Sequence, residues 1–224
     1  MKEKSHNKLP PLFSILFLML SLSVFNSCIG LSMDIQMRGN GSGRINAEYR
    51  ISSMAETIGR LDGNENWPII PVGRADFERS IARIDGMRLV SFSSRESPQE
   101  VVFNATLEFE NTEALIKFLD PLGTRTSLSP GRLDIIIKEN KQPEIDASLL
   151  ELARQVFTGY RFAVSFSSDS GGNSSMMVTD GAGREITSLP DAQIIQSGRK
   201  VSFSMDMAQL ISLTSGLGVS FRWQ

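Results

Sequence analysis

Apolar residues alternate with polar ones over much of the chain after residue 30, and this period of two constrains the fold more than any other feature. In LSMDIQMR (residues 31–38) and RINAEYRI (44–51) every second residue is apolar, and GNGSG (39–43) separates the two segments. Successive side chains of a β-strand point to opposite faces of a sheet, so this pattern buries one face and exposes the other. These residues are therefore predicted to form a half-buried β-hairpin.

The same alternation predicts further strands along the chain. In VVFNATLEFE (101–110) the inward-facing residues would be Val101, Phe103, Ala105, Leu107 and Phe109. The other predicted strands are MRLVSFSS (87–94), GRLDIIIK (131–138), YRFAVSFS (160–167), SSMMVT (174–179), KVSFSM (200–205) and LGVSFRW (217–223).

Helix signals are interspersed with these strands. Asp76 would cap a helix that ends at Gly86, and Asn111 would cap the helix TEALIKFL. Two more helices are predicted, a long one at residues 143–157 and a short one at 206–213. Because no regular βαβ repeat is visible, the pattern predicts an α+β fold, with a mainly antiparallel sheet made from hairpins and three or four helices packed on it. A single domain over residues 28–224 is expected, with residues 121–131 as the place where a seam would fall.

The N-terminus has the pattern of a bacterial lipoprotein signal peptide over residues 1–27. Its apolar run at residues 12–25 would span roughly 21 Å as a helix, less than the hydrocarbon core of a bilayer. The only cysteine, Cys28, ends this region, and Ser27 provides the small residue that a lipobox needs before it. Cys28 is therefore predicted to carry diacylglycerol and an acyl chain such as palmitate. A plain secretion signal and an uncleaved anchor are the alternatives.

Composition excludes several classes of function. One cysteine allows neither an internal disulfide nor a cysteine-based zinc site, and the single histidine, His6, lies in the predicted signal peptide. Catalysis that relies on a histidine base is thereby excluded from the mature chain. Residues 28–224 carry a net charge of −4 without a basic cluster, so no nucleic-acid partner is expected. No metal site and no cofactor are predicted.

Two groups of residues are candidates for a site. Asp34, Glu48, Glu108 and Glu110 are strand carboxylates, and a pair of them would be a candidate for acid–base chemistry. Each lies on the polar side of its strand, where exposure to solvent is expected, so no catalytic residue is assigned. The loop at residues 61–74 contains Trp67, Ile69 and Ile70, which are candidates for membrane contact or for a lid over the core. Of these two roles, the lid is favoured.

The order of these features resembles a known family. A hairpin of the form D-x-x-x-x-G-x-G-S-G closely follows Cys28, NATLEFENTEALIKFL joins a strand to a capped helix, and the last strand ends on Trp223. This arrangement is similar to the LppM-type extracytoplasmic lipoprotein domain. The overall organisation of the chain also resembles that of spirochaete lipoproteins. The resemblance implies a membrane-tethered module without a catalytic residue set, for which lipid binding has been suggested.

These observations predict a bacterial cell-envelope lipoprotein rather than an enzyme. It would be extracytoplasmic, held to the membrane through the lipid on Cys28, and would bind a lipid or an envelope protein. Only Ile29 and Gly30 separate Cys28 from the first predicted strand, so the domain is expected to sit directly on the membrane surface. Two other functions stay open: a glycan hydrolase that uses carboxylates alone, and a structural surface antigen or assembly subunit.

Overall fold

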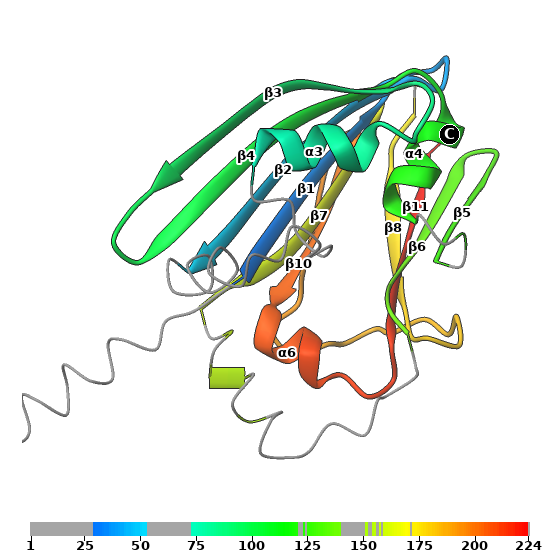
Figure 1. Cartoon of the computed structure of the whole chain (residues 1–224). Helices are drawn as coiled ribbons and strands as arrows, with labels where there is room; N and C mark the ends of the chain where they lie inside the picture. Colours follow the sequence, from blue (N-terminus) through cyan, green and yellow to red (C-terminus); the bar gives the residue numbers. More distant parts are fainter. Residues whose placement is uncertain are drawn as a thin grey trace, which may run out of the picture.

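The computed structural model describes residues 29–52, 73–120, 123, 125–139, 151, 154–155, 157, 159–170 and 172–223. Of these residues 52% lie in strands and 17% in helices, and the strands form two sheets. The predicted α+β fold with three or four helices packed on one sheet is therefore wrong. The fold is dominated by β-structure because a second sheet covers most of the face that helices were expected to cover (Figure 1).

The larger sheet has seven strands and the smaller has four. The order in the larger sheet is β3 (Met87–Glu96), β4 (Glu100–Phe109), β2 (Gly43–Ser52), β1 (Ile29–Met37), β7 (Arg161–Ser168), β10 (Lys200–Asp206) and β9 (Gln193–Ser197). The order in the smaller sheet is β5 (Thr126–Ser129), β6 (Arg132–Lys138), β11 (Leu217–Arg222) and β8 (Ser175–Thr179). All neighbours are antiparallel except β1 and β7, which run parallel.

The predicted hairpin of β1 and β2 is confirmed, with Ile35 opposite Ile45 and both side chains fully buried. The inward face predicted for β4 is also confirmed, since its five alternate apolar residues are all buried. Gly43, at the start of β2, has no room for a side chain. A Cβ there would lie 2.4 Å from Cζ of Phe109, because the ring of Phe109 on the neighbouring strand covers it.

The main core lies between the two sheets and is filled by side chains. Phe166 of β7 stacks on Phe221 of β11 at a ring-centroid distance of 5.3 Å, and it contacts Trp223 at 4.9 Å. Phe166, Phe203 and Phe221 are all inaccessible to solvent. Residues on both sides of the predicted seam at 121–131, such as Ile35 and Phe221, belong to the same buried cluster.

Three helices have defined bounds in the described part of the chain: α3 (Arg74–Ile81), α4 (Thr112–Leu119) and α6 (Met207–Ser212). Helix α3 begins before the predicted cap, Asp76, and buries Phe77 in a second cluster with Tyr49 and Phe103 on the larger sheet. Figure 1 shows α3 lying over the part of this sheet that the smaller sheet leaves uncovered. The predicted cap of α4 is confirmed, because the side chain of Asn111 accepts a hydrogen bond from the backbone of Ala114.

The sequence pattern did not predict β5 and β9. Strand β5 has only four residues, which is too short for a clear alternation in the sequence. All five residues of β9 are exposed, so this strand has no buried face that an alternation could indicate. The parallel pairing of β1 with β7 was not predicted either. The helix predicted at residues 143–157 lies largely outside the described residues.

We expect Phe166→Ala to lower the free energy of unfolding by about 3–5 kcal/mol, because it removes a fully buried ring that contacts both sheets and leaves a cavity. Urea denaturation followed by circular dichroism measures this loss. Ile195→Ala in β9 is the control, since Ile195 is 58% exposed and its truncation should change stability by about 0.5 kcal/mol or less. Equal effects of the two substitutions would contradict the packing described for the core.

Candidate functional site

The residues that the sequence singled out for lipidation and membrane contact are not among those described. Cys28, Trp67, Ile69 and Ile70 all lie outside the described residues, so their assigned roles stay predictions. The nearest described residue is Ile29, which is the first residue of β1 and pairs with Ile51 of β2. The sheet therefore begins at the residue after Cys28, and the predicted spacer of two residues is itself part of the strand.

The larger sheet has a polar face opposite its core. Residues at the alternate positions of its strands carry carboxylates, arginines, a lysine and hydroxyl groups, which form ladders across the strands. Two of the strand carboxylates that the sequence suggested as catalytic, Asp34 and Glu108, lie in such ladders. Each is surrounded by donors and faces no carboxylate directly across a neighbouring strand.

Glu108 of β4 lies between two arginines. The register places Arg44 of β2 and Arg88 of β3 directly opposite it on its two sides. Nη2 of Arg44 is 2.8 Å from Oε1 of Glu108, and the guanidinium of Arg88 contacts the other carboxylate oxygen. The hydrogen bond from Arg44, aided by the charges of both arginines, lowers the pKa of Glu108 below its ordinary value. Glu108 is therefore a charged structural residue of the polar face.

Asp34 of β1 is held in a similar way on the same polar face, nearer to β7 and β10. It accepts hydrogen bonds from Oγ of Ser165 at 2.6 Å and Nε2 of Gln36 at 2.7 Å, and Nζ of Lys200 is 2.8 Å from it. Burial alone would raise its pKa, but the hydrogen bonds from Lys200, Ser165 and Gln36 outweigh burial, so the pKa of Asp34 is lowered. The lowered pKa favours the charged carboxylate, and the contacts of this carboxylate join β1, β7 and β10.

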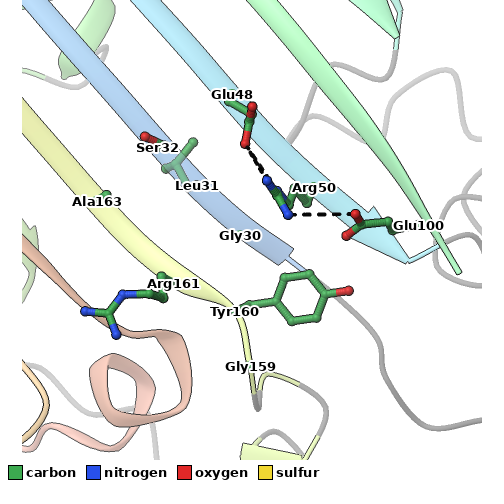
Figure 2. Close-up of a pocket in the computed structure, with 10 residues that line it drawn as sticks. All are labelled: Gly30, Leu31, Ser32, Glu48, Arg50, Glu100, Gly159, Tyr160, Arg161 and Ala163. Atoms are coloured by element: carbon green, nitrogen blue, oxygen red, sulfur yellow. Dashed lines mark hydrogen bonds and ion pairs between the residues drawn. The ribbon is translucent and has the colours of Figure 1, made fainter. Parts of the chain in front are cut away.

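A hollow lies on the polar face at the end of the sheet where β1 and β7 begin. Its volume is about 490 Å³. The described residues that line it are Gly30, Leu31, Ser32, Glu48, Arg50, Glu100, Gly159, Tyr160, Arg161 and Ala163 (Figure 2). We call this hollow the trough.

The trough exists because small residues in the middle of the sheet are flanked by long ones. On the polar face β1 presents Gly30 and Ser32, and the neighbouring β7 presents Ala163, which lies opposite Ser32. On the β2 side the register sets Arg50 opposite Gly30 and Glu48 opposite Ser32. The long side chains form walls around a floor of small ones. Sequence patterning alone does not reveal this arrangement, because β1 and β7 are far apart along the chain.

The two walls of the trough carry different charges. On one wall Arg50 lies between two carboxylates, with Nη2 3.1 Å from Oε1 of Glu48 and Nη1 3.8 Å from Oε1 of Glu100 (Figure 2). On the other wall, Nη2 of Arg161 donates to Oγ of Ser204 at 3.0 Å. Arg161 has no carboxylate partner in the part of the chain that the structure describes.

A second hollow of about 360 Å³ lies beside Met37 and Trp223, at the opposite end of β1 from Ile29. No cluster of three or more histidine, cysteine, aspartate or glutamate side chains among the described residues has the geometry to hold a metal ion. The described helices are all too short or too polar to cross a bilayer.

Comparison with known proteins adds no assignment to this geometry. Neither the family models nor the curated proteins give a match to the chain. The resemblance to the LppM-type domain therefore stays a prediction from the sequence.

The hydrogen bonds of Asp34 predict a dependence of stability on pH. Because the pKa of the folded state lies below the ordinary value of 3.8, the stabilisation is present above that value and is lost as the pH falls through the folded pKa. Asp34→Asn should therefore be less stable than the parent protein at about pH 7, and the difference should narrow at about pH 2.5.

Urea denaturation at the two pH values measures this difference. Asp169→Asn is the matched control, because Asp169 follows β7 on the same sheet and its side chain is exposed. If Asp34→Asn is less stable than the parent protein by the same free energy of unfolding at both pH values, the role given to the carboxylate is contradicted.

Proposed function

We propose that the protein is a bacterial envelope lipoprotein, held to the membrane by lipid on Cys28, whose β-domain has a non-enzymatic binding role at the membrane surface. The observation that carries this proposal is the position of β1, which begins at Ile29. A lipid on Cys28 would thus be attached one residue from a seven-stranded sheet. Lipoproteins that act at a distance need a tether, and this chain has no linker between Cys28 and its first strand.

The end of the sheet beside Cys28 would then face the membrane. Consecutive Cα atoms are about 3.8 Å apart, so the start of β1 cannot lie far from a lipidated Cys28. The end of β2 and the start of β7 are beside the start of β1, through the pairs Ile29–Ile51 and Leu31–Phe162. The trough lies on the polar face near this end of the sheet.

The chemistry of the trough favours binding over hydrolysis of a glycan. A glycosidase places the bond that it cleaves between two carboxyl groups, one of which acts as an acid. Here the guanidinium of Arg50 occupies the space between Glu48 and Glu100 (Figure 2). Two further strand carboxylates, Asp34 and Glu108, are held by cations. These contacts support a role in recognition rather than acid–base catalysis.

The filled core favours a ligand that binds at the surface. The aromatic rings between the two sheets contact one another directly, as Phe166 and Phe221 do, instead of lining a space for an acyl chain. Close packing of this kind leaves little room for a guest without displacement of side chains. The binding role is therefore assigned to the outer surface of the sheet.

Metabolic labelling with a clickable fatty acid tests the anchor. We expect the parent protein to take up the label and to stay in the membrane fraction, and we expect Cys28→Ala to lose the label, since the sequence contains no other cysteine. Ser93→Ala is the control, because Ser93 is an exposed residue of β3 outside the trough. Equal labelling of the parent and Cys28→Ala would show that the anchor assignment is wrong.

A further inference from the structure

We propose that the trough binds a small zwitterion that joins a primary ammonium group to a phosphate, and that its source is the phosphoethanolamine headgroup of a lipid. The chemistry of recognition rests on the trough alone. The choice of a lipid as the source rests on the proposed function, because it requires the end of the sheet beside Cys28 to face the membrane.

Charge is separated across the trough. Glu48, Arg50 and Glu100 together give the β2 side of the trough one excess negative charge. Arg161 gives the β7 side one positive charge that forms no ion pair with a described carboxylate, since Asp206, opposite it on β10, accepts a hydrogen bond from the backbone of Ala208 instead. A pocket that is neutral as a whole but has opposite charges on its two walls complements a molecule with two opposite charges.

Both walls of the trough have hydrogen-bonding groups available to a ligand. A guanidinium has five N–H donors. Among the described residues, the guanidinium of Arg161 donates one hydrogen bond, to the hydroxyl of Ser204. Its remaining donors suit the oxygens of a phosphate, which arginine binds through paired hydrogen bonds. On the opposite wall Glu48 and Glu100 have lone pairs beyond those that Arg50 occupies, and a primary ammonium can donate to them.

The trough has the size of a small ligand. Strand β1 lies between β2 and β7, and neighbouring strands are about 4.8 Å apart, so the backbones that bear Arg50 and Arg161 are separated by about 10 Å. Long side chains stand on both sides of the small floor of Gly30, Ser32 and Ala163, and the guanidinium of Arg161 is turned toward Ser204 of β10 (Figure 2). This space, about 490 Å³ in volume, suits one headgroup and is too small for a folded partner.

The type of ammonium group decides specificity. A primary ammonium has three N–H donors for the carboxylates, whereas a trimethylammonium has none and needs more space. An aromatic cage is the usual means of recognising a quaternary ammonium, and Tyr160 is the only aromatic residue among the described residues that line the trough. The trough is therefore expected to prefer ethanolamine over choline.

Calorimetric titration of the full lipidated chain in a neutral detergent tests this recognition. The probes are glycerophosphoethanolamine, glycerophosphocholine and glycerol 3-phosphate, which have no acyl chain, so binding does not depend on the anchor. We expect saturable binding of glycerophosphoethanolamine and at least about tenfold weaker binding of the other two, because each lacks one charge-assisted set of hydrogen bonds. Equal affinity for the ethanolamine and choline probes, or no binding of any probe, would overturn the proposal.

Substitutions in the trough locate the site. Arg161→Gln and Glu48→Gln should each weaken binding of glycerophosphoethanolamine by about tenfold or more. Arg199→Gln is the matched control, since Arg199 is an exposed arginine just before β10, at the opposite end of the sheet from Arg161. If Arg161→Gln binds as tightly as Arg199→Gln, the assignment of Arg161 is wrong.

A variant that fills the trough provides a second test that does not alter charge. Ser32→Leu should abolish binding, because Ser32 is an exposed floor residue between Glu48 and Ala163. Ser93→Leu is its control on the same face of the sheet. Thermal melts of both variants show whether they are folded. A folded Ser32→Leu that retains full affinity would overturn the site.

Competition by lipids distinguishes the headgroup from a soluble zwitterion. The lipidated chain is placed in nanodiscs of phosphatidylcholine, with or without phosphatidylethanolamine, and titrated with glycerophosphoethanolamine. We expect phosphatidylethanolamine to weaken the apparent affinity of the soluble probe, and no competition would overturn the lipid source. If Cys28 carries no lipid but the probe still binds in detergent, the proposed anchor is wrong and the recognition chemistry stands.

Discussion

The packing of apolar side chains between the two sheets is the constraint on which the rest of the structure depends. Phe166 is central to it, since this one ring on β7 contacts both Phe221 and Trp223 at the end of the chain. Strand β7 is in turn paired with β1, the first described strand. The beginning, the middle and the end of the chain are therefore joined across one core, and β1 is held in the interior of the larger sheet.

The same alternation that buries one face of the larger sheet produces its polar face. Once Ile35 and Ile45 point into the core, Asp34 and Arg44 must point away from it. Exposed ion pairs contribute little to stability, so ladders such as Arg44–Glu108–Arg88 fix the positions of charges more than they hold the fold. In the trough a floor of small side chains interrupts the ladders between charged walls.

The sequence predicted the strands better than it predicted their assembly. The hairpin of β1 and β2, the inward face of β4 and the cap at Asn111 could all be predicted, because each depends on neighbours in sequence. The existence of two sheets could not, because alternation shows that one face is buried without showing what covers it. The trough could not be predicted for the same reason, since Glu48 and Arg161 come together only through the parallel pairing of β1 with β7.

The sequence by itself determined which side chains are buried, where most strands run, and that Cys28 is the only thiol available for a lipid. Side-chain periodicity and amino-acid chemistry are local properties, and they can be interpreted without knowledge of distant contacts. The tertiary structure alone decided that a second sheet covers the first, and that one end of the polar face holds a trough with opposite charges on its walls. Both depend on strand order and register, which are set by long-range packing of the core rather than by any single segment.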